Sequence, residues 1–206
     1  MNRYLSICLL VAAPLCGTFP AQAGVIGLVK NVVPSTIWVS PNGDHVICVT
    51  VDPQTKKRRV NLDGQLLPGA YDAIAKDTPF FSAVGKHHAF VATRGGKCMV
   101  VIDGVEQPSY DIIKDRWPIT GLMFGADGGK THVAYQVSEK DKHAVVVNGK
   151  KLGAYDSIKG GLPGIWDFYF EGSYFAYRAK VGDKMVACRG HVDGDKVHLV
   201  QSKPYL

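Results

Sequence analysis

The sequence lacks the short motifs that mark several common enzyme classes. It contains no Gly-x-Ser-x-Gly elbow, no His-Glu-x-x-His pair, no phosphate-binding glycine loop and no Cys-x-x-Cys. An enzyme that collects its active-site residues from several separate loops would escape this test. The sequence therefore favours a binding protein over an enzyme, and we expect no cofactor.

Long apolar runs are also scarce. The first residues hold the longest one, which is shorter than the roughly 20 residues needed to span a bilayer. Arg3, the apolar stretch over residues 4–16 and the small residues Ala21 and Ala23 together form the pattern of a cleaved export signal. We predict a signal peptide at residues 1–23 and one mature domain at residues 24–206 that is not membrane-spanning and is exported to the periplasm or the extracellular space.

Cysteine is sparse after the predicted signal peptide, where only Cys48, Cys98 and Cys188 remain. An odd number leaves at least one thiol unpaired in a compartment where disulfides persist. A disulfide between Cys48 and Cys188 would join the first and last repeats described below. Buried free thiols in apolar strands are the commoner arrangement, and both alternatives stay open.

Charge of one sign is not strongly in excess. The chain has 24 Lys+Arg against 18 Asp+Glu, so it is mildly basic. A basic surface attracts anionic partners, but an exported chain rarely meets nucleic acid. We expect a protein or a cell-envelope component as the partner, and no nucleic acid.

What the sequence does contain is a fourfold repeat with a period of about 40–45 residues. Each unit opens at a proline, continues through strands separated by glycine turns, and reaches Asp-Gly or Asn-Gly in the first three units and Arg-Gly at 189–190 in the fourth. A Tyr-Asp-x-Ile segment is predicted as the closing strand of the first three units. The four units lie near residues 34–74, 79–113, 118–158 and 163–200.

Four strands in each unit of this length are typical of β-propeller blades. We predict an all-β fold, a small β-propeller of about four four-stranded blades. Residues 26–29 are similar to the strand that the fourth unit lacks, which predicts a ring closed by pairing of the N- and C-terminal strands. Two alternatives stay open: a half-ring that forms a homodimer with eight blades, and an open β-solenoid.

The Ser-Pro-Asn-Gly hairpin at residues 40–43 and the apolar strand after it provide a family resemblance. They resemble the Ser-Pro-Asp-Gly hairpin of WD-like, TolB-type periplasmic β-propellers. The resemblance implies the propeller fold and a periplasmic location. It implies nothing about the partner, because the additional domain of that family is absent.

Three tryptophans are candidate ligand-binding residues. Trp38, Trp117 and Trp166 lie in or just before the first strands, nearest the predicted ring axis. There they could stack on a sugar or an aromatic ligand, although packing between blades explains them equally well.

Three histidines are candidate metal ligands. His45, His87 and His132 occupy the same position in successive units, and a circle of imidazoles could bind zinc or copper. Their position beside a turn, one strand away from the axis, instead favours structural residues at a hairpin edge.

The sequence thus supports two functional hypotheses. The first is an exported, non-catalytic propeller scaffold for protein or cell-envelope interaction, and the alternative is a small-ligand, sugar or metal site, binding or hydrolytic, at the mouth of the ring.

Overall fold

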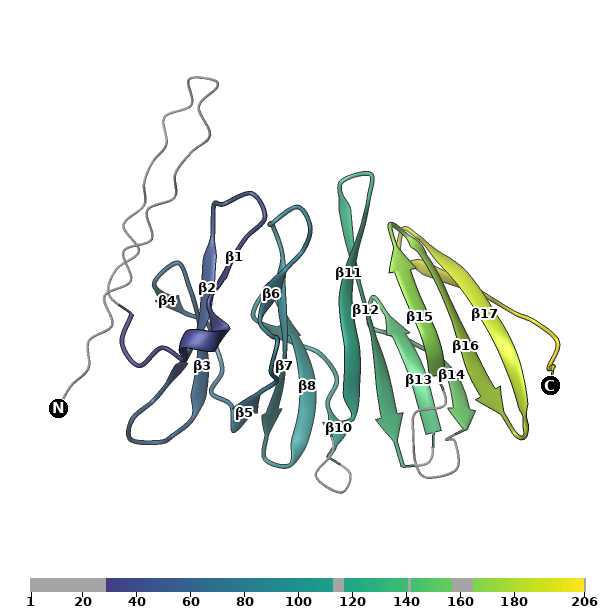
Figure 1. Ribbon diagram of the computed structural model, residues 1–206, viewed down its shortest axis with the longest axis horizontal. Coiled ribbons are helices and arrows are strands. Elements are labelled where there is room, and N and C mark those ends of the chain that lie inside the picture. Colours follow the sequence, from purple (N-terminus) through teal and green to yellow (C-terminus); the bar gives the residue numbers. More distant parts are fainter. Residues whose placement is uncertain (1–28, 113–116, 141, 157–164, 206) are drawn as a thin grey trace.

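The computed structural model describes residues 29–112, 117–140, 142–156 and 165–205. Apart from one short 3-10 helix, η1 (Pro34–Thr36), every regular element in this part of the chain is a β-strand. The described residues include no helix with the length and apolar composition needed to cross a membrane. The strands form four antiparallel sheets, which Figure 1 shows side by side in chain order. The predicted all-β fold is therefore confirmed.

Sheets 1, 3 and 4 each contain four strands in sequence order. Each strand pairs with its neighbours along the chain, as expected where short hairpins join successive antiparallel strands. Sheet 1 contains β1 (Trp38–Val39), β2 (Val46–Val51), β3 (Arg58–Leu62) and β4 (Gln65–Leu66); sheet 3 contains β11 (Ile119–Asp127), β12 (Lys130–Glu139), β13 (Lys142–Val147) and β14 (Lys150–Asp156); sheet 4 contains β15 (Ile165–Glu171), β16 (Tyr174–Val181), β17 (Lys184–Asp193) and β18 (Lys196–Gln201).

Sheet 2 has the same plan with interrupted edges. Two short strands pair with one side of β7, and two more pair with the free side of β8. Its strands are β5 (Ala73–Ile74), β6 (Phe80–Phe81), β7 (His88–Arg94), β8 (Lys97–Ile102), β9 (Val105–Glu106) and β10 (Tyr110–Asp111). Sheet 2 thus keeps the four strand positions of a unit, and two short strands occupy each of its two outer positions.

The Tyr-Asp-x-Ile segment closes its own sheet in the second and third units, as predicted, where it pairs with β8 and with β13. In the first unit it joins two sheets instead. Tyr71 pairs with Arg58 in β3 of sheet 1, while Ala73 and Ile74 pair with β7 of sheet 2. The residue between them, Asp72, accepts a hydrogen bond from Lys57 Nζ in sheet 1 and another from Gly95 N in sheet 2. In the third unit Asp156 repeats this contact with Lys142 and with Gly182 N of sheet 4. These aspartates therefore hold consecutive units together.

The Asp-Gly and Asn-Gly turns form between the third and fourth strands as the sequence predicts. Both residues of each pair have positive φ, the backbone geometry of the type I′ hairpin turn. They are Asp63 and Gly64, Asp103 and Gly104, and Asn148 and Gly149.

In the fourth unit the predicted Arg-Gly turn is wrong. Strand β17 runs through Gly190 as far as Asp193, and the chain turns at Gly194 instead. A Cβ atom on Gly190 would lie 2.0 Å from the carbonyl oxygen of His198 and 2.3 Å from the ring of Phe175. Glycine is needed at this position for close packing inside the sheet, because no side chain fits there.

The core lies between the sheets. One apolar cluster fills each of the three junctions between consecutive sheets. Phe90, Tyr135 and Tyr177 occupy the same position in sheets 2, 3 and 4, and each packs against the preceding sheet. Burial of a large apolar side chain stabilises the folded state by about 1.5–3 kcal/mol. The apolar clusters between the sheets therefore hold the stack together.

The described strands do not form the predicted ring. Residues 26–28 of the proposed closing strand lie outside the described residues. The segment after them pairs within sheet 1, where Val32 bridges Thr50 and Val33 N donates to Val49 O at 2.9 Å. Strand β18 pairs with β17, and among the described residues no strand joins sheet 4 to sheet 1. The four sheets form an open stack with two ends.

Candidate functional site

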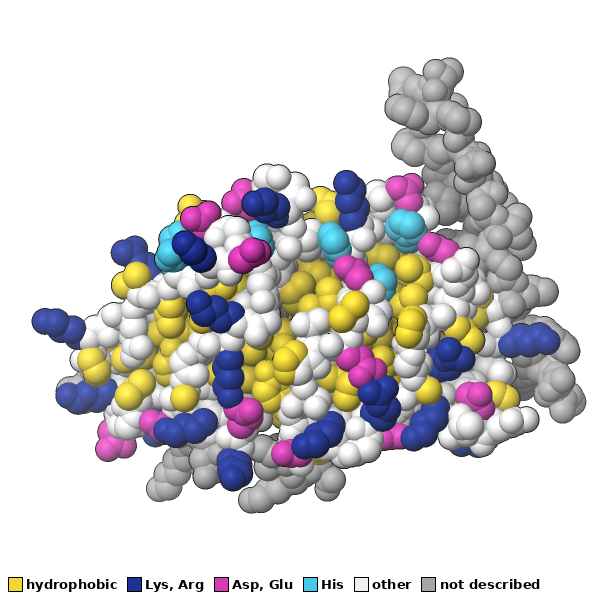
Figure 2. All heavy atoms as spheres, turned by 180° about the vertical axis from the view of Figure 1, so that it is seen from behind, with side chains coloured by type: hydrophobic (Ala, Val, Ile, Leu, Met, Phe, Trp, Pro, Cys, Tyr) yellow, Lys and Arg dark blue, Asp and Glu magenta, His cyan; other side chains and the backbone are white. Residues whose placement is uncertain are grey.

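The repeated polar side chains gather along one edge of the stack, which we call the histidine edge. It comprises His45, His87, His88 and His132 with the turn residues Asp63, Asp103 and Asn148. Antiparallel pairing brings the turn after the first strand and the turn after the third strand to the same end of a sheet, so these residues meet there. Figure 2 shows histidine side chains along the upper edge of the molecule.

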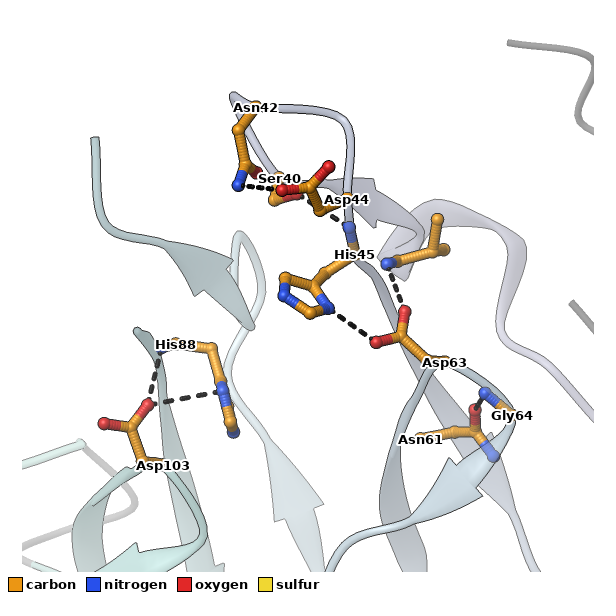
Figure 3. Close-up of polar contacts among 10 residues, drawn as sticks. Ser40, Asn42, Asp44, His45, Asn61, Asp63, Gly64, His88 and Asp103 are labelled. Atoms are coloured by element: carbon orange, nitrogen blue, oxygen red, sulfur yellow. Dashed lines mark hydrogen bonds and ion pairs between the residues drawn. The ribbon is translucent and has the colours of Figure 1, made fainter. Parts of the chain in front are cut away.

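In the first unit, Asp63 binds both the backbone and the histidine. Its Oδ1 accepts a hydrogen bond from Val46 N at 2.8 Å, and its Oδ2 lies 2.7 Å from His45 Nδ1 (Figure 3). An ionised carboxylate can only accept, so the proton of His45 lies on Nδ1. A neutral His45 therefore carries its lone pair on Nε2.

In the second unit, Asp103 contacts two histidines. Its carboxylate lies 2.7 Å from His87 Nδ1 and 3.4 Å from His88 Nδ1, and it accepts a hydrogen bond from His88 N at 2.9 Å. The side chain of His88 is buried, and its Nε2 has no partner among the described residues. Burial lowers the pKa of His88, and the charge of Asp103 opposes this shift.

In the third unit, Asn148 reverses the proton position on the histidine. Its Oδ1 accepts from Val133 N at 2.9 Å, which turns its amide nitrogen toward His132 Nδ1 at 3.0 Å. The amide donates, so Nδ1 of His132 accepts and the imidazole proton lies on Nε2. One change from aspartate to asparagine thus gives the equivalent histidine the opposite tautomer.

The first two units also pack tightly together at the histidine edge. The ring of Phe81 lies between His45 and His88, with centroid distances of 6.4 Å to each. A Cβ atom on Gly85 would lie 2.2 Å from Asn42 Oδ1, so the two hairpin turns are in direct contact. These contacts hold the first two units together at this edge.

The structure does not bring together the three histidines predicted as metal ligands. His45, His87 and His132 lie in three different sheets, and each has its own polar partner. In the part of the chain that the structure describes, no three His, Cys, Asp or Glu side chains are arranged to hold a metal ion. The contacts indicate the structural role that their position beside a turn also favours.

The three tryptophans predicted to bind a ligand also belong to different sheets. Trp38 lies in β1 and is half-exposed, whereas Trp117 precedes β11 and packs partly buried against the core between sheets 2 and 3. Trp166 lies in β15, where its backbone pairs with Arg178. The described strands form no ring mouth on which the three could converge.

Of the two alternatives left open for Cys48 and Cys188, the structure shows free thiols and not the disulfide. Cys48 lies in sheet 1 and Cys188 in sheet 4, at opposite ends of the stack, and both are buried free thiols. Burial raises the pKa of Cys48 to about 11, and burial raises that of Cys98 to about 11 as well. Thiols with pKa values this high are poor nucleophiles at neutral pH.

Sequence reasoning missed an exposed surface, the outward side of sheet 4, which we call the end face. It is defined by Tyr169, Tyr174, Arg178, Arg189 and Val200. Along β16, exposed residues alternate with the residues buried against sheet 3. The alternation itself was visible in the sequence, but the prediction of a closed ring placed both sides of this sheet in the interior.

The end face combines aromatic, aliphatic and cationic groups. The exposed fractions of Tyr174 and Val200 are 66% and 58%. A hollow of about 520 Å³ lies over the small side chains of Ala176 and Ala187 and is bordered by Arg178, Arg189 and Val200. Arg178 pairs with Asp167, whereas Arg189 has no ion-pair partner among the described residues.

Comparison with known proteins does not identify a family for this chain. No protein-family model matches it, and no curated protein matches it. The turn at residues 40–43, which suggested the TolB-type resemblance, closes with a hydrogen bond from Gly43 N to Ser40 O at 2.8 Å. The second unit repeats this bond between Gly85 N and Ser82 O at 2.8 Å, so the turn is a feature of the repeat.

Proposed function

We propose that this chain is an exported, non-catalytic scaffold of propeller-like blades that binds a protein or cell-envelope partner through the end face. The observation that carries the proposal is the uncovered side of sheet 4, where Tyr169, Tyr174 and Val200 are exposed. The three junctions between consecutive sheets each bury an apolar cluster, whereas no described sheet covers this side of sheet 4. Export rests on the signal-like pattern of residues 1–23.

The composition of the end face supports a macromolecular partner. Interface centres are enriched in tyrosine and arginine, and these residues supply most of the strong contacts in measured interfaces. Arg189 lacks an ion-pair partner among the described residues, so a partner that presents a carboxylate would complement it. We therefore expect the partner to be acidic where it meets the hollow.

A non-catalytic role is supported by the use that the fold makes of its repeated reactive groups. The aspartates of the turns, Asp63 and Asp103, cap backbone amides and bind histidines, and Asp72 and Asp156 join neighbouring sheets. Groups engaged in this way are held by the fold and are not available to act on a substrate.

We further propose that the sheets are blades of the propeller type, as the TolB-type resemblance implies, arranged as an open stack. Strand order within each sheet and the face-to-face contact of consecutive units support this interpretation. The alternative, in which two copies complete an eight-bladed ring, is distinguished by the mass in solution. We expect a monomer, and a stable dimer would instead favour the ring.

The proposed function is tested by capture of partners from cell-envelope extract with immobilised protein. We expect one protein or envelope component to be enriched by the native chain and lost with the double variant Tyr174→Ala, Arg189→Glu. Val105 is exposed on β9 of sheet 2, so Val105→Lys is the matched control and should retain the partner. Thermal melts establish that the variants fold. Capture of nothing above background, or equal capture by both variants, would contradict the proposal.

A further inference from the structure

Two of the seven histidines differ from the rest. Five have a hydrogen-bond or ion-pair partner: His45, His87, His88, His132 and His143. The remaining two, His191 and His198, have no such partner within the described part of the chain. They make ring contacts alone. The polar framework of the fold therefore leaves the nitrogens of these two rings free.

The two free histidines face each other across adjacent strands. His191 in β17 is directly opposite His198 in β18, and their rings are stacked with centroids 4.7 Å apart and planes inclined by 12°. Their neighbours Val192 and Val197 are buried in the core between sheets 3 and 4, so both histidines point to the outward side of sheet 4. Both residues are exposed.

We propose that His191 and His198 form a chelating site for a divalent transition-metal ion, with copper(II) as the preferred ion. Neutral imidazole is a ligand for zinc, copper and nickel, and copper(II) is bound most tightly among the divalent ions of the first transition series. Metal–nitrogen bonds of about 2.0–2.1 Å join nitrogens that are up to about 4 Å apart. Rotation of two exposed rings whose centroids are 4.7 Å apart is enough to reach that separation.

The number of ligands also favours copper(II) over zinc. A structural zinc site has four protein ligands, and a catalytic one has three. The outward side of β17 and β18 offers two imidazoles, which leaves the other positions to water, an arrangement that suits the tetragonal geometry of copper(II).

The test is titration of the full chain with copper(II) at pH 7.5, where free imidazole is mostly neutral, by calorimetry and electron paramagnetic resonance. We expect one ion to bind in each chain, with a spectrum that shows two nitrogen ligands. Loss of one imidazole removes the chelate, so His191→Gln and His198→Gln should each weaken binding by at least about tenfold. The double variant His191→Gln, His198→Gln should abolish it.

A second double variant, His45→Gln, His87→Gln, is the matched control because it removes two exposed histidines from the histidine edge. It should retain the copper affinity of the native chain, and melts without metal establish that both double variants fold. The proposal is overturned if the native chain shows no saturable binding, or if the His191, His198 variant binds as tightly as the native chain. Loss of binding in the control alone would place the metal at the histidine edge instead. None of these outcomes depends on whether the end face binds a macromolecular partner.

Discussion

The turn aspartate of the second unit is the side chain whose replacement tests the repeat most directly. Replacing Asp103 by alanine removes the acceptor for His88 N, which lies on a buried residue, and an unsatisfied buried amide costs about 1–3 kcal/mol. Asp103 has a φ of 49°, and a left-handed conformation costs an ordinary residue such as alanine about 1–2 kcal/mol. The exposed contact with His87 adds at most about 1 kcal/mol. We therefore expect Asp103→Ala to lower the free energy of unfolding by about 3 kcal/mol.

Asp103→Asn should behave differently, because the third unit has an asparagine, Asn148, at the equivalent position. Asn148 has a φ of 46° and its Oδ1 accepts from Val133 N at 2.9 Å, so asparagine satisfies both demands of the position. We expect Asp103→Asn to cost less than about 1 kcal/mol. The assay is equilibrium urea unfolding at pH 7.5, with an unchanged dependence on denaturant as the sign that the denatured state is the same.

Asp44→Ala is the matched control for these variants. Asp44 is exposed and accepts a hydrogen bond from the nearby Asn42, so its loss should change the free energy of unfolding by less than about 0.5 kcal/mol. If Asp103→Ala and Asp103→Asn were equally unstable, the charge and not the backbone cap would be the important contribution. If neither were destabilised, the turn cap would have no role in stability.

Two further predictions concern a buried histidine and a packed glycine. Burial lowers the pKa of His88 in the folded state below the ordinary histidine value near 6.5. The contribution of His88 to stability is therefore present above pH 6.5, and it is lost as the pH falls from 6.5 through the folded-state pKa. The melting temperature of the native chain should fall between pH 7.5 and 5, and His88→Gln should reduce the slope; an unchanged slope would refute this cause. Gly190→Ala should prevent stable folding because its Cβ would meet backbone 2.0 Å away, whereas Gly194→Ala, with open space and a φ of 58°, should cost about 1 kcal/mol in urea unfolding. Equal stability of the two glycine variants would refute the packing argument.

The parts of the fold that sequence predicted correctly are those that depend on local chemistry. Asp63 and Gly64 form a type I′ turn because both tolerate positive φ, and this requirement is written in two adjacent residues. The facing of the second strands follows from alternation along a single strand, which turns Phe90, Tyr135 and Tyr177 to the same side of their sheets.

The turn of the fourth unit shows why the remainder was not predictable. Glycine serves both at a positive-φ turn and where a neighbouring backbone comes close, and the sequence does not separate these uses. With the turn at Gly190, residue 191 would follow the turn and could not face His198. The observed turn at Gly194 shifts the pairing and brings His191 opposite His198. The proposed copper site therefore depends on a strand register that local sequence patterns left undetermined.

The side chains on the end face differ from those at the equivalent positions of sheets 2 and 3. In sheets 2, 3 and 4 the residue paired with the aligned alanine of the second strand is Ile102, Val147 and Arg189. The first two pack against the next sheet, whereas a fifth sheet in the same position would bury the guanidinium of Arg189, at a cost of several kcal/mol without an anionic partner. The outward side of sheet 1, with Cys48 and Asn61 buried, offers no carboxylate at these positions to a second copy. We therefore expect a partner of the end face to bring its own acidic group.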